Sequence, residues 1–175
     1  MGMDLSPFVL TVKTAVVSTL ITFLLGILGA RLVIRCEPKL KWILDALFTL
    51  PLVVPPTVIG FFLLYALGTK SFIGQFLMNF NIRIVFSWTG AVISAVVVSF
   101  PLMYRTARGA FEQVDNNIIY AARTLGLSEL KIFWKIIFPL CLPGIGAGAV
   151  LSFARAMGEF GATLMVAGNI PGKTQ

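Results

Sequence analysis

Four long uncharged stretches divide the chain, and charged residues lie on both sides of each. They cover residues 14–30, 46–69, 84–104 and 136–154 and contain 17, 24, 21 and 19 residues. A helix needs about 20 mainly apolar residues to cross a bilayer. Each stretch is therefore long enough to span, the first with a charged side chain at its end reaching back to the interface. The pattern predicts spanning helices over about 10–32, 46–68, 84–104 and 142–166.

The fourth predicted span has prolines at its beginning and charges near its end. Pro139 and Pro143 remove backbone donors, so we expect the helix to begin near Leu142. It then runs through Arg155 and Glu159 to about Val166.

The segment 105–138, between the third and fourth spans, has the periodicity of a helical hairpin. Asp115 or Asn116 can cap a short helix, and Gly126 suits the left-handed position that follows its end. Apolar residues recur at helical spacing and form one face with two alanines at its centre. These residues are Val114, Ile118, Ala121, Ala122 and Leu125. A second helix is predicted from Ser128 to Pro139.

Two interpretations of this hairpin remain open on pattern alone. Its apolar face fits a groove of a partner protein. Alternatively the hairpin lies flat on lipid headgroups, held by Lys131, Lys135 and Trp134.

Composition narrows the class of protein. Hydrophobic residues make up 58% of the 175 and charged residues 12%, with a mean hydropathy of +0.94. Soluble domains carry about 25% charged residues, so a soluble enzyme, a disordered chain and a nucleic-acid-binding module are excluded. There is no histidine, and Cys36 and Cys141 lack metal-binding spacing. The sequence predicts an all-α integral membrane protein that binds no metal.

The distribution of basic residues predicts the orientation. Nine lie after the first span and between the third and fourth spans, whereas four lie on the other side. The nine are Arg31, Arg35, Lys39, Lys41, Arg105, Arg108, Arg123, Lys131 and Lys135, and the four are Lys13, Lys70, Arg83 and Lys173. The positive-inside rule places the nine in the cytoplasm. The hairpin is then cytoplasmic, and both ends of the chain are outside.

Prolines and small residues occur inside the predicted spans. Pro51, Pro55 and Pro56 lie in the second, and glycines and alanines fill residues 144–149 of the fourth. Ordinary close packing of helices explains them. Kinked helices that line a pathway are the alternative.

The hairpin resembles the motif of ABC importer permeases, written EAA, three residues, G, nine residues, I-x-L-P. Here the motif runs from Tyr120-Ala121-Ala122 through Gly126 to Ile136-Ile137-Phe138-Pro139, and both spacings match. Tyr120 replaces the usual Glu and Phe138 the usual Leu. The resemblance implies a type I ABC importer transmembrane domain. It also implies that the hairpin is the coupling helix that docks into a cytoplasmic ATPase subunit, through Tyr120, Ala121, Ala122, Gly126, Ile136 and Pro139.

Further segments are similar to the molybdate or tungstate permeases of that family. They are Leu50-Pro51-Leu52-Val53-Val54-Pro55-Pro56, Phe86-Ser87-Trp88, Gly158-Glu159-Phe160-Gly161-Ala162-Thr163 and Gly168-Asn169-Ile170-Pro171-Gly172-Lys173-Thr174. Some of these segments are shared with sulfate/thiosulfate permeases, so a sulfate permease is the alternative. Family members continue with another spanning helix, and we expect this chain, with four spans of five or more, to lack it.

The resemblance implies a single permease domain over residues 1–175 in the inner membrane of a prokaryote. The implied partners are a second copy of the chain, an ATPase subunit, an extracytoplasmic oxyanion-binding protein and the lipid bilayer, with no nucleic acid. No GxxxxGK[ST] motif occurs. We therefore expect no cofactor on this chain and place ATP and Mg²⁺ on the partner. A non-transporting scaffold or channel is the alternative, but neither needs the motif spacing.

Arg155 and Glu159 are the charged pair inside the fourth span, at i and i+4. A lone charge at mid-bilayer costs roughly 2.5–3.5 kcal/mol, so pairing is expected. Either the pair locks helices together, or Arg155 attracts an oxyanion on a path also lined by Pro55 and Pro56.

Overall fold

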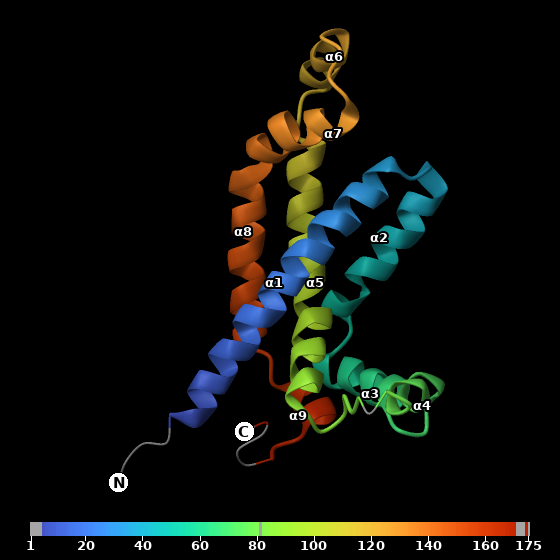
Figure 1. Ribbon diagram of the computed structural model, residues 1–175, viewed down its shortest axis with the longest axis vertical. Coiled ribbons are helices and arrows are strands. Elements are labelled where there is room, and N and C mark those ends of the chain that lie inside the picture. The colour runs from blue at the N-terminus through green and yellow to red at the C-terminus, as the bar shows by residue number, and fades with distance from the viewer. Residues whose placement is uncertain (1–4, 81, 171–173, 175) are drawn as a thin grey trace.

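The computed structural model describes residues 5–80, 82–170 and 174 of the chain, and its regular elements there are all helices (Figure 1). The elements are α1 (Ser6–Arg35), α2 (Pro38–Val53), α3 (Pro56–Leu67), α4 (Phe72–Met78), α5 (Trp88–Glu112), α6 (Asn116–Thr124), α7 (Glu129–Ile132), the π-helical turn η1 (Phe133–Ile137), α8 (Phe138–Met157) and α9 (Gly161–Ala167). The predicted all-α class is confirmed. The Pro171–Lys173 part of the GNIPGKT segment lies outside the described residues.

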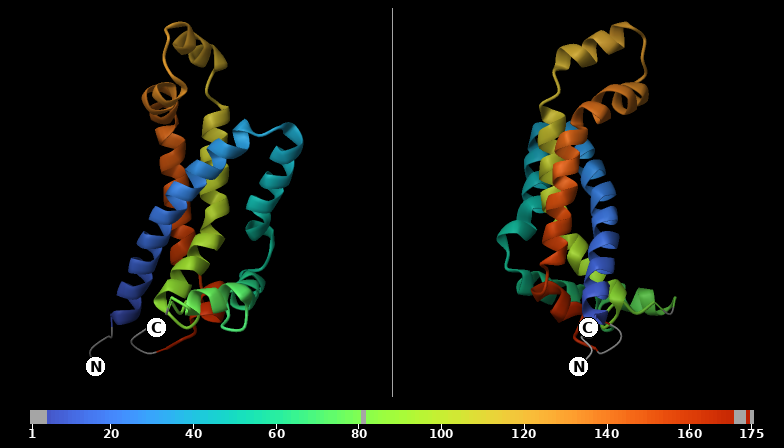
Figure 2. Two further views of the ribbon diagram at one scale, coloured as in Figure 1. Left: turned by 45° about the vertical axis from the view of Figure 1, so that its right-hand side comes forward. Right: turned by 90° about the vertical axis from the view of Figure 1, so that its left-hand side faces the viewer.

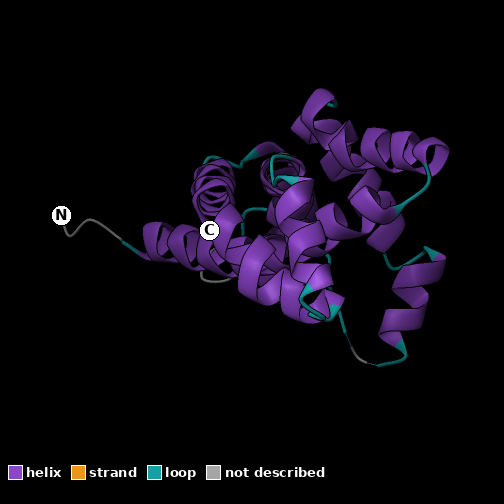
Figure 3. Cartoon of the chain, turned by 90° about the horizontal axis from the view of Figure 1, so that it is seen from above, coloured by secondary structure: helices purple, strands orange, loops and turns teal. Residues whose placement is uncertain are grey.

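Helices α1, α5 and α8 pack together as the core, and α2 lies beside α5 (Figures 1 and 2). Helices α6 and α7 lie at one end of this bundle, and α3, α4 and α9 lie at the other. Seen from above, the described chain is made of helices joined by loops (Figure 3). Three helical segments are long and apolar enough to cross a membrane, or four if α2 and α3 together form one broken span.

The span predicted over 46–68 is not one continuous helix. Its two halves, α2 and α3, are bent by 113° across Val54 and Pro55. Val54 and Pro55 are extended, with ψ of 134° and 138°. Consecutive prolines have this effect because each lacks a donor and each disfavours helical geometry in the residue before it.

The fourth span also differs from the prediction, at both ends. Pro139 does not end the helix from Ser128, because η1 inserts a wide turn in which the Phe138 N–H bonds the Phe133 carbonyl. The missing donor of Pro139 then falls where the hydrogen-bond pattern changes from π to α. At the other end α8 stops at Met157, so residues 158–160 form an elbow before α9 instead of a helix running to Val166.

Small and hydroxylated residues allow the three core helices to approach closely. A Cβ at Gly26 of α1 would lie 2.5 Å from the Met103 side chain of α5, and one at Gly148 of α8 would lie 2.2 Å from the Thr106 hydroxyl. Thr22 and Ser99, both fully buried, are joined by a 3.2 Å hydrogen bond between α1 and α5. In a bilayer the hydrophobic effect does not drive helices together, so close packing and interhelical hydrogen bonds of this kind are what join them.

Candidate coupling hairpin and intramembrane ion pair

The α6–α7 hairpin, residues 115–132, has the local geometry that its sequence predicts. The Asn117 N–H donates to the Asp115 carboxylate at 2.9 Å, which caps α6. Gly126 has φ of +76°, a conformation in which a side chain is strained. The Leu127 N–H then bonds back to the Ala122 carbonyl at 3.2 Å. Both capping predictions are confirmed.

An ion pair closes the hairpin across its turn. Arg123 Nε and Nη2 donate to the two Glu129 oxygens at 2.7 and 3.2 Å, so α6 is tied to the first residue of α7. The hydrogen bond to Glu129 raises the pKa of Arg123, which stays charged. Because both side chains are about half exposed, the pair adds little to the free energy of folding. Its main effect is to fix the orientation of α6 relative to α7.

The two central alanines of α6 do not share a face. Ala122 is 3% exposed and turns into the hairpin, whereas Ala121 is exposed. Tyr120, Ile118 and Leu125 are exposed too, and Leu125 is 81% exposed. Adjacent helical positions point about 100° apart, so a flat surface built on both alanines is not what the hairpin presents. Ala121 and the three large side chains are exposed apolar groups of the hairpin that a partner could contact.

The base of the hairpin joins the bundle through an aromatic cluster. Phe133 is 5% exposed and contacts the rings of Phe111, Trp134 and Phe138, with centroids 5.2 to 6.1 Å apart. The Arg31 guanidinium of α1 lies 3.8 Å from the Phe133 centroid. The base of the hairpin therefore contacts the ends of both α1 and α5 through Phe133.

The last two motif residues lie away from the exposed end of the hairpin. Ile136 is half-buried in η1, and Pro139 is exposed in the first turn of α8. They belong to the helix that returns into the bundle. Of the six predicted coupling residues, the structure places Tyr120, Ala121 and Gly126 on the exposed part of the hairpin.

Arg155 and Glu159 form the ion pair that their spacing predicts. Arg155 Nη1 lies 2.8 Å from Glu159 Oε2, and the Glu159 side chain is 1% exposed against 31% for Arg155. The second oxygen of Glu159 accepts the Ala162 N–H at 2.8 Å. Glu159 therefore fixes the elbow between α8 and α9 with both of its oxygens.

The two helix breaks meet in space. A Cβ on Gly161, the first residue of α9, would lie 3.4 Å from the Pro56 Cβ and 3.2 Å from the Thr57 methyl group. A Cβ on Gly60 would lie 2.8 Å from the Ala162 Cα. The structure thus brings the Pro55–Pro56 break against the Glu159 elbow, although the two are about 100 residues apart in sequence.

A polar cluster between α2 and α5 was not predicted. Arg108 pairs with Asp45 and, through Nε at 3.0 Å, with Glu112. Lys41 Nζ lies 2.8 Å from the same Glu112 oxygen, and the Tyr104 hydroxyl donates to Asp45 at 3.0 Å. The sequence carries a partial signal, because Lys41 and Asp45 are four residues apart on α2, and Tyr104, Arg108 and Glu112 repeat at the same spacing on α5.

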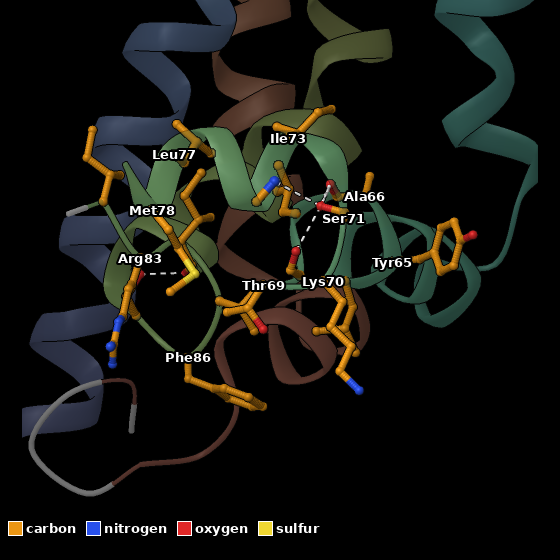
Figure 4. A pocket seen from close by; sticks show the side chains of 18 of the residues that line it. Tyr65, Ala66, Thr69, Lys70, Ser71, Ile73, Leu77, Met78, Arg83 and Phe86 are labelled. Atoms are coloured by element: carbon orange, nitrogen blue, oxygen red, sulfur yellow. Dashed lines mark hydrogen bonds between the residues drawn. The ribbon is translucent and has the colours of Figure 1, made fainter. Parts of the chain in front are cut away.

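A hollow of about 1580 Å³ lies at the opposite end from the hairpin, between α3, α4 and the chain leading into α5 (Figure 4). Its lining is mostly apolar, with Lys70 and Arg83 as its cations. Ser71 shapes the wall, because its hydroxyl donates to the Ala66 carbonyl at 2.6 Å and accepts the Gly74 N–H at 2.9 Å. Lys70 and Arg83 point to the same side in Figure 4.

Comparison with known proteins decides the family. The model of the family described as "binding-protein-dependent transport system inner membrane component" matches residues 9–173. The chain belongs to this family. These inner membrane components of binding-protein-dependent transport systems are transport subunits, and the chain is accordingly a multi-pass protein of the inner membrane.

Individual relatives in the family cover most of the chain. The molybdenum transport system permease protein ModB of Escherichia coli (strain K12) is 47% identical over 167 residues, which are 95% of this chain and 73% of that protein. ModB of Haemophilus influenzae is 45% identical over 174 residues, 99% of this chain and 76% of that protein. The sulfate transport system permease protein CysT of Salmonella typhimurium is 35% identical over 165 residues, which are 94% of this chain and 60% of that protein.

Proposed function

We propose that the chain is the membrane-spanning permease subunit of an ABC importer that carries molybdate, or the related tungstate, into the cytoplasm. The observation that carries the proposal is the 45–47% identity to the ModB permeases over nearly the whole chain. The more distant sulfate permeases, at 35%, make sulfate the second candidate cargo.

ATP and Mg²⁺ belong, in this proposal, to a separate ATPase subunit. The α6–α7 hairpin is its docking element, presenting Tyr120, Ala121 and Leu125 beyond the end of the bundle. A capped, ion-paired hairpin with exposed apolar side chains supports this role. Trp134, Lys131 and Lys135 are exposed as well, so a hairpin resting on lipid is the competing arrangement.

Two further partners complete the proposed assembly. The three core helices α1, α5 and α8 pack directly on one another, so no path runs between them in the described part of the chain. A second copy of the chain would therefore enclose the path against the outer surfaces of this bundle. An extracytoplasmic oxyanion-binding protein would deliver the cargo at the end that carries α3, α4 and α9.

The Arg155–Glu159 pair holds the elbow beside the path. Both Glu159 oxygens are engaged, which supports a locking role for the carboxylate. Arg155 keeps 31% of its side chain exposed and is the member of the pair that can meet an anion in passage. A conducting path binds its cargo weakly, and a cation already paired with a carboxylate fits that requirement.

The test is uptake into proteoliposomes that contain the permease, its ATPase and its binding protein. Molybdate should accumulate only with ATP, and excess tungstate should compete more strongly than excess sulfate. Preferential sulfate uptake would assign the second cargo. Leakage of molybdate without ATP, or assembly without any uptake, would identify a channel or a scaffold.

A further inference from the structure

Helix α2 is attached to the bundle less firmly than the other long helices. None of its residues from Pro38 to Val53 is buried. Extended residues bound it at both ends, with ψ of 155° at Cys36 and 134° at Val54. An element with few buried contacts and extended joints at both ends is a low-cost element to move.

Side chains of α5 bind α2 mainly around Lys41 and Asp45. Asp45 binds Arg108 and Tyr104, while Lys41 and Arg108 share one oxygen of Glu112. Phe48, one turn further along α2, packs edge-on against Phe100 and Tyr104, with centroids 5.2 and 5.1 Å away. The attachment therefore combines ion pairs and hydrogen bonds with the apolar packing of Leu44 and Phe48.

The ion pairs of this cluster lie within reach of water. Their charged side chains are 18–39% exposed, and partly exposed ion pairs are weak, whereas Tyr104 is fully buried. A cavity of about 420 Å³ adjoins the pair, lined in part by Lys41, Trp42, Asp45 and Arg108. Space for the side chains to change partners is present.

We propose that the Asp45–Arg108 pair, with Lys41, Tyr104 and Glu112, is a latch that fixes α2 to α5 in one of the two transport states. The latch opens when α2 swings about its two extended joints, so that the path changes the side to which it is open. Arg108 and Asp45 act as positioning residues and touch no cargo. The inference rests on the proposed function, since it assigns the moving element of that transport cycle.

The first experiment measures transport per ATP in proteoliposomes of the complete importer. Asp45→Asn and Arg108→Gln each weaken the state in which α2 is latched to α5. Molybdate uptake per ATP hydrolysed should therefore fall about fivefold or more, the size of an allosteric coupling. Arg108→Lys keeps the charge and should recover part of the ratio. Arg105→Gln removes an exposed cation from the same helix and should leave the ratio unchanged. Equal ratios in all four variants would overturn the latch.

The second experiment tests whether the latch must open. Asp45→Cys and Arg108→Cys are combined in a chain with Cys36→Ser and Cys141→Ser, and the two thiols are joined by a short bifunctional reagent. Uptake, already lowered by loss of the ion pair, should stop on cross-linking and return to that lowered level when the link is cleaved by reductant. Full uptake by the cross-linked chain would overturn the proposal.

The third experiment reads the motion without reference to cargo. Spin labels at Ile43→Cys and Gln113→Cys, both exposed positions, report the distance between α2 and the end of α5. A non-hydrolysable ATP analogue should add a second distance in the unmodified importer, and Asp45→Asn should show that distance without nucleotide. One distance throughout would overturn the latch. If two distances appear but molybdate is not taken up, the proposed cargo is wrong and the latch still stands.

Discussion

The Arg31 guanidinium lies over the Phe133 ring at 3.8 Å from its centroid, which ties the end of α1 to the base of the α6–α7 hairpin. Phe133 also packs on Phe111 at the end of α5. One side chain at the base of the hairpin therefore contacts two core helices.

Phe133→Ala should lower the free energy of unfolding by about 3–5 kcal/mol, because it leaves a cavity among buried rings. Arg31→Gln keeps the ring packing and removes only the cation, at a cost of about 1 kcal/mol. Denaturant titration in detergent micelles measures both. Leu130→Ala, at an exposed position on α7, is the control and should change stability least. A Phe133→Ala chain as stable as the control would show that the cluster is not packed as described.

Gly126→Val should strain the hairpin turn by roughly 1 kcal/mol or more, because φ of +76° is disfavoured for a side chain. No atom lies within 4 Å of a Cβ built there, so the effect comes from the backbone alone. Gly109→Ala is the matched control, since it also meets nothing within 4 Å but lies in the helix α5. We expect Gly126→Val to weaken binding of the ATPase subunit and Gly109→Ala to leave it intact. Equal binding by both would contradict this role of the turn.

Ala121→Glu and Ala122→Glu should fail in different ways. Ala121 is exposed, so the first change keeps the hairpin folded and blocks its docking surface. Ala122 is 3% exposed, so the second buries a carboxylate and disrupts the hairpin itself. Protease sensitivity of the loop separates the two, and co-purification with the ATPase measures docking.

The lipid-surface arrangement makes a different prediction for the same assay. If the hairpin rests on headgroups, Lys131→Gln with Lys135→Gln should reduce transport more than Ala121→Glu does. Intact assembly and hydrolysis with Ala121→Glu would favour that arrangement over docking.

Glu159→Ala should destabilise the chain by about 1–3 kcal/mol, because it unpairs Arg155 and leaves the Ala162 N–H without its acceptor. Glu159→Gln keeps an oxygen for that N–H and loses only the ion pair, so its loss should be smaller. Thermal unfolding of the two variants side by side gives the order. A larger loss for the glutamine variant would contradict the capping role of the carboxylate.

The sequence predicts local features of this chain well. The Asp115 cap, the left-handed Gly126 and the Arg155–Glu159 pair all follow from spacings of a few residues, and the structure contains all three. Such features depend on backbone geometry that neighbouring residues determine on their own.

Features set by distant partners were not predictable in the same way. The prolines at 55 and 56 left a kink open as an alternative to one continuous span, and the 113° bend comes with α3 packed against α9 through Gly60 and Gly161. The sequence predicted Ala121 and Ala122 together on one outer face. In the structure α7 packs against α6 and buries Ala122 but not Ala121, which the local pattern does not determine. The Asp45–Arg108 pair joins positions 63 residues apart, so its period-four signal had meaning only once α2 and α5 were adjacent.

The π-helical turn η1 sets the direction in which the hairpin faces. The wide turn holds one residue more than an α-helical turn, so the segments on either side of it keep the relative facing that an α-helix one residue shorter would give them. Phe133 and Ile132 are buried while Trp134 and Lys135 face outward, an arrangement that the wide turn fixes relative to α8. A chain with Lys135 deleted would close the wide turn to an α-helical one and leave the hairpin facing almost the same way, whereas the same residues wound as a continuous α-helix would turn it by roughly a quarter of a circle. The facing of the hairpin relative to the membrane-spanning helices therefore depends on this wide turn being kept.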